Sequence, residues 1–166
     1  WAYLLLCWKN LRTTMSELKE GDKAPHFKGV DQNGDSISSD DFKGKKLILY
    51  FYPKDDTPGC TKEACNLRDN YNELKNTGFE VVGVSADTSS KHVKFIEKYD
   101  LPFSLIADTE KEVINAFACW GPKKFMGKEY EGILRKTFII ENDTILKVFE
   151  KVKTTAHFEQ IMEALN

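Results

Sequence analysis

The segment from residue 57 to residue 65 holds two cysteines in a setting that could make one of them reactive. It reads Thr-Pro-Gly-Cys-Thr-Lys-Glu-Ala-Cys, with Cys60 and Cys65 five positions apart. Thr57 suits the N-cap of a helix, and Pro58 suits the first helical position, where a missing N–H costs nothing. Cys60 is therefore expected in the first helical turn, where unpaired amides and the helix dipole stabilise a thiolate, the nucleophilic form of cysteine.

A second positive group is needed beside Cys60. A helix terminus contributes roughly 0.3–1 kcal/mol, which leaves most of an ordinary thiol protonated at neutral pH. The sequence contains Arg12, Arg68 and Arg135 as its arginines. Arg68 lies about 12 Å beyond Cys60 along a helix and is expected to face solvent. Arg135 directly precedes a predicted strand at the rim of the sheet, so by elimination we predict that Arg135 is the cation beside Cys60.

Cys60 and Cys65 could form a disulfide only after a local change of structure. Residues i and i+5 of an ideal helix have Cα atoms roughly 8.5 Å apart. A disulfide needs a Cα separation of about 4.4–6.8 Å. If the two thiols pair, the first turns of the helix must unwind, and we expect the redox state of the pair to be coupled to local unfolding.

The elements that must position these residues alternate between strands and helices. Continuous apolar runs typical of buried strands occupy residues 47–52, 79–86, 103–107 and 137–140. Helices are expected from about residue 57 to residue 76 and over residues 89–99. This alternation predicts parallel pairing with right-handed crossovers.

The end of the chain adds antiparallel structure and a last helix. Asn142 and Asp143 are a turn signal, so residues 137–140 and 145–152 should form an antiparallel hairpin. An amphipathic helix is expected over residues 158–165. We therefore predict an α/β fold with a mixed central sheet and helices on both faces. In such sheets the functional residues gather at the carboxyl ends of the parallel strands, which is where Cys60 follows its strand.

Composition and charge indicate one globular domain. The chain has 166 residues, of which 41% are hydrophobic and 30% charged, and its net charge is -2. These values exclude a disordered chain and give no electrostatic footprint for nucleic acid or an anionic membrane. Residues 1–14 begin with eight apolar residues, too few to span a bilayer, and their positive charges follow the apolar stretch instead of preceding it. We interpret residues 1–14, with Cys7, as an extension outside the domain (upstream translation, a truncated leader or an expression remnant, with a degraded targeting segment as the alternative) and residues 15–166 as a single domain.

Other uses of the two cysteines are less consistent with the sequence. A zinc site would need a second Cys/His pair, which does not follow the C-x4-C spacing. A dithiol oxidoreductase of the thioredoxin type would need C-x-x-C. A cysteine hydrolase needs a histidine base, but His92 and His157 fall in predicted helices and are expected to be solvated or packed. Cys119 is expected to be a spectator, with a distant resolving thiol as its alternative role.

The residues around Cys60 resemble the active-site motif of the peroxiredoxins, P-x-x-x-T/S-x-x-C. Pro53, Thr57 and Cys60 stand at the matching positions, and Cys65 resembles the second cysteine of the peroxiredoxin Q group, also called bacterioferritin-comigratory proteins. Further similarities cover most of the chain, at residues 21–25, 120–121, 127–128 and 135–140. His26 departs from the pattern, since an acidic residue is usual there, and Cys119 is an additional thiol.

The resemblance implies a thioredoxin-like fold and a thiol-dependent peroxidase without metal or other cofactor. Cys60 would be the peroxidatic cysteine and Cys65 the resolving one, joined in an intramolecular disulfide. Thr57 and Arg135 would orient and polarise the peroxide, and Pro53 would shield the sulfur. The implied partners are a hydrogen peroxide or organic hydroperoxide substrate and thioredoxin or a similar dithiol reductant.

Two expectations concern the setting of this activity, and one alternative stays open. Pairing of both thiols within one helix favours a monomer, and recycling of a disulfide favours the reducing cytoplasm. A binding or chaperone module on the same scaffold, with idle cysteines, is the alternative. Titration of the thiols with hydrogen peroxide separates the two, because idle cysteines react only at the slow rate of free cysteine.

Overall fold

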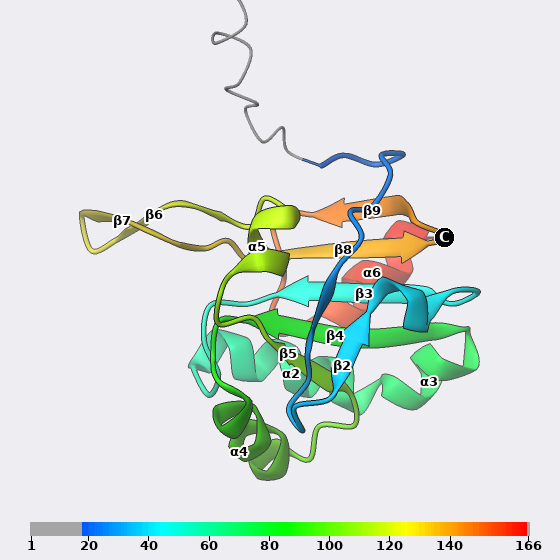
Figure 1. Ribbon diagram of the computed structural model, residues 1–166, viewed down its shortest axis with the longest axis horizontal. Helices are drawn as coiled ribbons and strands as arrows, with labels where there is room; N and C mark the ends of the chain where they lie inside the picture. The colour runs from blue at the N-terminus through cyan, green and yellow to red at the C-terminus, as the bar shows by residue number, and fades with distance from the viewer. Residues whose placement is uncertain (1–17, 166) are drawn as a thin grey trace, which may run out of the picture.

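A five-stranded sheet forms the centre of the protein (Figure 1). The computed structural model describes residues 18–165, so the extension predicted over residues 1–14 lies outside the described residues, as does Cys7. The strand order is β5-β4-β3-β8-β9. These strands are β3 (Lys46–Phe51), β4 (Phe79–Ser85), β5 (Ser104–Ala107), β8 (Lys136–Glu141) and β9 (Thr144–Phe149).

The pairing of these strands confirms the predicted mixed sheet. β3, β4 and β5 are parallel to one another, whereas β8 runs antiparallel to both β3 and β9. The hairpin between β8 and β9 turns at Asn142 and Asp143, which have φ angles of 49° and 61°. Two successive left-handed residues make a turn whose twist matches that of the paired strands, and Asn and Asp tolerate this conformation well.

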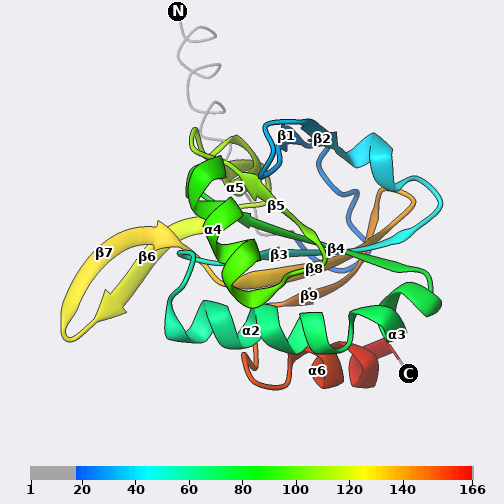
Figure 2. The same cartoon turned by 90° about the horizontal axis from the view of Figure 1, so that it is seen from below.

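Helices cover both faces of the sheet (Figure 2). One face packs against α2 (Pro58–Asp69), α3 (Tyr71–Asn76), α4 (Ser89–Tyr99) and α6 (His157–Leu165). The other face packs against α5 (Glu112–Ala116), the short 3-10 helix η1 (Ser39–Phe42) and the ribbon of β1 (Lys28–Val30) and β2 (Ser36–Ser38). Parallel strands are joined by crossovers that pass over a face of the sheet. The helices α2, α3 and α4 are the crossovers between β3, β4 and β5, as the predicted alternation of strands and helices requires.

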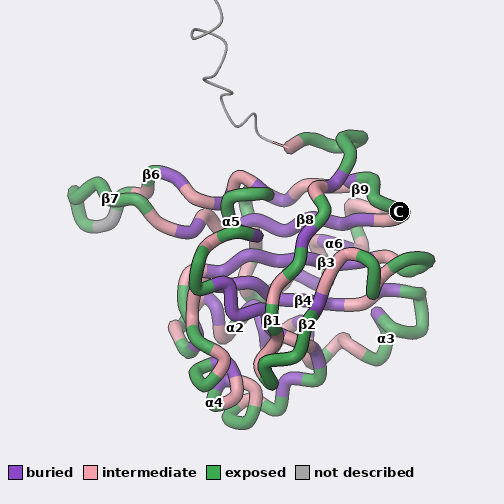
Figure 3. Tube along the Cα trace, viewed as in Figure 1, coloured by how far each residue is buried: buried purple, intermediate pink, exposed green. Residues whose placement is uncertain are grey.

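The side chains of β3 divide between two hydrophobic cores. Leu47, Leu49 and Phe51 belong to the core beneath α5, whereas Ile48 and Tyr50 belong to the core beneath α2 and α6. In a strand, successive side chains point to opposite faces, so a continuous apolar run is buried on both. The buried segments in Figure 3 accordingly follow the strands of the central sheet.

One detail of the predicted helices is wrong. The helix expected over residues 57–76 is divided at Asn70, whose side-chain amide donates to the Asn66 carbonyl at 2.8 Å. An asparagine that bonds to the backbone in this way offers the chain an alternative to continued helix. Of the residues at positions 93, 96 and 99 that an apolar pattern selects, Ile96 and Tyr99 are partly buried and pack against the core beneath α2, while the fully buried residues of α4 are His92 and Phe95. His92 is buried because it has polar partners, described below.

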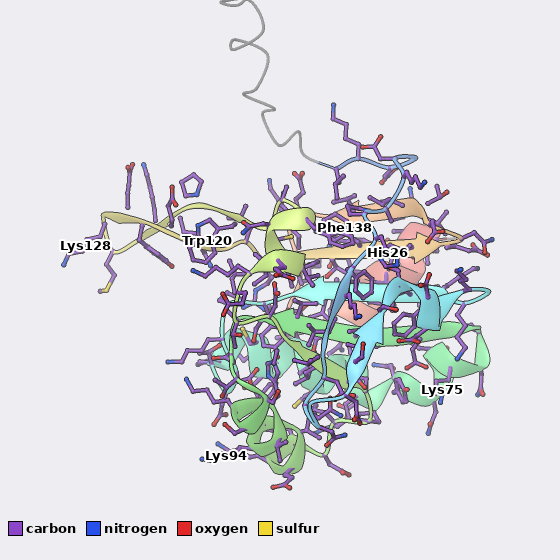
Figure 4. All side chains as sticks on the ribbon, in the orientation of Figure 1. His26, Lys75, Lys94, Trp120, Lys128 and Phe138 are labelled. Carbon is purple, nitrogen blue, oxygen red and sulfur yellow. The ribbon has the colours of Figure 1, made fainter. Side chains whose placement is uncertain are left out.

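A two-stranded hairpin extends beyond the sheet, formed by β6 (Trp120–Phe125) and β7 (Lys128–Ile133). Figures 1 and 4 show it projecting from the body of the protein, with Lys128 at its tip and Trp120 near its base. The sequence prediction missed this hairpin, α5 and the β1–β2 ribbon, because they are short or lack an alternating apolar pattern. Within residues 18–165, no helix is both long enough and apolar enough to cross a membrane.

Candidate active site at the start of α2

Cys60 lies in the first turn of α2, as predicted. β3 ends at Phe51, the loop of residues 52–57 follows, and α2 begins at Pro58. The Cys60 side chain is only 1% exposed. The amides of a first helical turn have no partners within the helix, so they and the helix dipole give Cys60 a positive electrostatic environment.

Arg135 supplies the second positive group. Its Nη2 donates to Cys60 Sγ at 3.1 Å across 75 residues of sequence. The strand register explains this proximity: β8 is antiparallel to β3, with Lys136 paired to Phe51, so the residue before β8 stands beside the loop that follows β3. A Cβ on Gly59 would lie 3.2 Å from Arg135 Nη2, so the glycine leaves room for the guanidinium.

Glu63 is a member of this site that the sequence analysis missed. Its carboxylate accepts from Arg135 Nη1 at 2.5 Å, and its side chain is fully buried. Burial raises the pKa of Glu63 to about 7, although the charge and hydrogen bond of Arg135 act in the opposite direction. The three-residue spacing between Cys60 and Glu63 could have predicted this member of the site. Residues three apart share one face of a helix, so Glu63 faces the same side as Cys60.

His157 extends the buried polar group to α6. Its Nε2 lies 2.8 Å from Thr137 Oγ1 and 3.9 Å from the Glu63 carboxylate. Its Nδ1 lies 3.0 Å from the side-chain oxygen of Gln160, whose amide donates to the Lys151 carbonyl. This arrangement assigns the imidazole proton to Nδ1. Burial lowers the pKa of His157 to about 4, so the ring is neutral at pH 7.

The structure places Thr57 at the predicted N-cap but gives its side chain another partner. Thr57 has extended backbone angles, as an N-cap residue should, and Pro58 follows at the first helical position. Its hydroxyl donates to the Lys54 carbonyl at 2.9 Å, and no helix amide in the described chain donates to it. Thr57 is therefore the N-cap residue that the sequence predicts, while its hydroxyl forms a hydrogen bond within the preceding loop. Pro53 lies partly buried at the other end of this loop.

Cys65 lies in the same helix as Cys60 and is partly exposed. Both cysteines are free thiols, and α2 is continuous between them. A continuous helix keeps the Cα atoms of Cys60 and Cys65 farther apart than a disulfide allows, so a bond between the two sulfurs needs a different conformation of α2.

Cys119 is separated from this site by the sheet. It belongs to the core beneath α5, whereas Cys60 belongs to the core beneath α2. Its side chain is fully buried, and burial raises the pKa of Cys119 to about 12 in spite of the nearby charge of Lys136. A thiol that stays protonated is a poor nucleophile, which agrees with the expected spectator role.

Two histidines are packed in the interior, whereas His26 is exposed. His92 and His157 are both fully buried, which is the packed alternative of the two that the sequence left open. Among residues 18–165, no group of three or more His, Cys, Asp or Glu side chains is arranged to hold a metal ion.

The chain is similar to known proteins over most of its length. Residues 20–149 match the model of the AhpC/TSA family. The chain is 45% identical to peroxiredoxin Bcp of Escherichia coli over 152 residues, which are 91% of this chain and 97% of that protein. It is 43% identical to peroxiredoxin Bcp of Bacillus subtilis over 146 residues, 87% of this chain and 93% of the relative.

Solved structures show the same likeness. Peroxiredoxin Q of Xanthomonas campestris superimposes with a TM-score of 0.80 at 30% identity, covering 90% of this chain and 96% of that one. The peroxidoxin BcpB of Mycobacterium tuberculosis gives a TM-score of 0.78 at 31% identity, covering 90% and 97%. The bacterioferritin comigratory protein of X. campestris, studied for alkyl peroxide reduction, gives 0.80 at 29% identity, covering 90% and 97%. The expected thioredoxin-like fold is confirmed.

Proposed function

The chain belongs to the AhpC/TSA family and is a thiol-dependent peroxidase of the peroxiredoxin class, and we propose that Cys60 is its peroxidatic residue. The contact between Arg135 Nη2 and Cys60 Sγ, at 3.1 Å, carries this proposal. A fixed guanidinium and a helix N-terminus both favour the thiolate over the thiol. Of the three cysteines in the described part of the chain, Cys60 has both of these partners.

The first step oxidises the sulfur. The Cys60 thiolate attacks the terminal oxygen of the peroxide, so that an S–O bond forms as the O–O bond breaks. The leaving oxygen takes a proton and departs as water or an alcohol, and Cys60 becomes a sulfenic acid. Arg135 and Thr57 stabilise the charge that develops on the separating oxygens, and Pro53 shields the sulfur from solvent.

Cys65 completes the cycle as the resolving thiol. After the first turns of α2 unwind, the Cys65 sulfur displaces the hydroxyl of the sulfenic acid, which leaves a disulfide and water. Thioredoxin or a similar dithiol then reduces the disulfide by exchange and is itself oxidised. Hydrogen peroxide and organic hydroperoxides are the proposed substrates. We place the cycle in the cytoplasm and in a monomer, because both cysteines belong to one helix and recycling needs a reducing compartment.

Two substitutions test these assignments. Cys60→Ser should abolish peroxide turnover, because no other thiol in the described chain has a comparable setting. Cys65→Ser should consume one peroxide for each Cys60 and then stall at the sulfenic acid, and a further equivalent of peroxide should give overoxidised Cys60, visible by mass spectrometry. A near-normal rate in the Cys60 variant would refute the central assignment, whereas an unchanged thioredoxin-coupled rate in the Cys65 variant would point to Cys119.

The disulfide and the unwinding have tests of their own. Peptide mapping after one equivalent of peroxide should recover Cys60 linked to Cys65. Amide hydrogen exchange over residues 57–66 should be faster in the oxidised protein than in the reduced one, because the first turns of α2 lose their backbone hydrogen bonds. Equal exchange in the two states would contradict the coupling of redox state to local unfolding.

A further inference from the structure

The loop that leads into α2 is bound to α4 through a buried aspartate. Asp55 Oδ2 lies 2.6 Å from Nδ1 of His92 in α4, across 37 residues of sequence. Asp55 Oδ1 accepts from the Tyr52 hydroxyl at 2.6 Å, and the Asp55 amide donates to Asp87 Oδ2 at 2.8 Å. The carboxylate is 5% exposed and the imidazole is fully buried, so water does not weaken these contacts.

His92 is in turn anchored to the sheet. Its Nε2 lies 2.9 Å from the carbonyl oxygen of Ile106 in β5, and a carbonyl can only accept. The Nε2 atom therefore carries a proton, and a short hydrogen bond joins Nδ1 to the Asp55 carboxyl group. Inside the low-dielectric core such a hydrogen bond is electrostatically stronger than the same bond in water.

The next residue, Asp56, is held by the other end of α4. Its carboxylate accepts from Lys98 Nζ at 2.8 Å and from the Tyr99 hydroxyl at 2.6 Å. Asp56 has a φ of 57°, in the left-handed region that residues with a side chain rarely adopt. This backbone angle turns the chain toward Thr57 and the start of α2.

We propose that α4 clamps the loop of residues 53–57 and thereby holds Cys60 in the conformation that reacts with peroxide, with Asp55 and His92 as its main positioning residues. The inference rests on the proposed function, because it concerns the same cysteine cycle. Figures 2 and 4 show α4, marked by the outward-facing Lys94, at the end of the sheet where this loop leaves β3.

The clamp sets how easily α2 unwinds. The contacts of Asp55 and Asp56 fix the backbone immediately before the N-cap, and unwinding the first turn requires that backbone to move. Contacts made only in the folded conformation stabilise that conformation alone. Loss of these contacts should raise the population in which α2 is unwound and Cys60 can reach Cys65. The folded population, which reacts with peroxide, should change proportionally less.

The test separates the two chemical steps in Asp55→Asn and His92→Gln. Each variant is mixed with hydrogen peroxide in a single turnover and quenched at intervals. Mass spectrometry then follows the gain of one oxygen at Cys60 and the later loss of two hydrogens relative to the reduced protein. Loss of one buried hydrogen bond should raise the rate of disulfide formation about tenfold. It should also lower the fraction of overoxidised Cys60 at high peroxide.

A matched control distinguishes the clamp from general destabilisation. Ile96→Ala removes an apolar side chain from α4 that packs on the core beneath α2 and makes none of the loop contacts. It should lower thermal stability and leave disulfide formation unchanged. Equal rates of disulfide formation in Asp55→Asn, His92→Gln and Ile96→Ala would overturn the proposal.

A second variant keeps the test available if the buried substitutions prevent folding. Lys98→Ala combined with Tyr99→Phe removes the two partners of Asp56 at exposed or partly exposed positions. This double variant should also form the disulfide faster, and no increase would overturn the clamp. Failure of Cys60 to react with peroxide in the unmodified chain would instead refute the proposed function, so the two failures are distinguishable.

Discussion

At the scale of single residues, one guanidinium serves two buried acceptors. Arg135 contacts the sulfur of Cys60 with one nitrogen and the carboxylate of Glu63 with the other. The planar fork of arginine can hold both at once, whereas the ammonium of lysine is a compact charge on a flexible stem. Glu63 therefore fixes the direction in which Arg135 points, although Glu63 itself does not contact the sulfur.

Arg135→Lys should lower the rate of Cys60 oxidation by hydrogen peroxide by about 100-fold, comparable to the loss of one donor from a charge-stabilising site. The lysine retains the charge but loses the two-point geometry. Stopped-flow measurement of sulfenic acid formation checks the rate. Arg68→Lys is the matched control, since Arg68 pairs with Asp69 and the Tyr99 carbonyl, and its rate should stay at the normal value. Equal effects of the two substitutions would contradict the special position of Arg135.

At the scale of elements, close packing between neighbouring strands supports the core in which Cys60 lies. Gly83 in β4 lies beneath the ring of Tyr50 in β3 and beside Leu105 in β5. A Cβ at position 83 would come within 2.8 Å of Tyr50 Cζ and 2.7 Å of Leu105 Cδ2. Tyr50 shares the core of Cys60, so a glycine in β4 allows the strands and this aromatic layer to pack as they do.

Gly83→Ala should destabilise the protein by about 1–3 kcal/mol, the usual range for an overpacked core. Chemical denaturation measures the free energy of unfolding. Gly132→Ala in β7 is the control, because its Cβ would meet only side-chain atoms of Lys123 and Tyr130, at 3.3 Å. The expected change there is within about 0.5 kcal/mol. Similar losses at both positions would argue against the close approach in the sheet.

At the scale of the whole molecule, the sheet divides the protein into two environments. The face beneath α2 and α6 holds Cys60, the buried carboxyl group of Glu63 and the partly buried guanidinium of Arg135, and the other face holds Cys119 in an apolar core. Two buried titratable groups, Glu63 and His157, lie on the first face with their pKa values shifted in opposite directions by the same cause, burial. Their effects on stability therefore oppose each other.

The free energy of unfolding should change little between about pH 4.5 and pH 6.5 through these two groups. The pKa of Glu63 rises from 4.5 to about 7 on folding, so its contribution is present below pH 4.5 and lost as the pH rises through 7. The pKa of His157 falls from 6.5 to about 4, so its contribution is present above pH 6.5 and lost as the pH falls through 4.

Single substitutions should reveal how each of the two groups makes the free energy of unfolding depend on pH. Glu63→Gln leaves the His157 effect alone, so stability should rise with pH across this window by about 1.4 kcal/mol per unit. His157→Gln leaves the Glu63 effect, so stability should fall with pH at a similar rate. Denaturation at a series of pH values measures both, and parallel profiles for the two variants and the unmodified chain would show that these groups do not titrate as described.

Local sequence was sufficient for the features that depend on near neighbours. The start of α2 at Thr57 and Pro58, the strand from residue 47 and the turn at Asn142 were all predictable, because backbone preference and side-chain spacing act over a few residues. Arg135 could be predicted as well, since few arginines compete for the role and it directly precedes a predicted strand.

Contacts between distant segments were decided by the tertiary structure alone. Which residues become buried together depends on strand register and helix packing, and neither is encoded in a short window of sequence. Glu63 became part of the site because α2 turns it under Arg135, and His92 became the partner of Asp55 because α4 packs against the loop after β3. A polar residue on a predicted helix has no visible partner in the sequence, so only the folded chain shows whether solvent or a buried charge satisfies it.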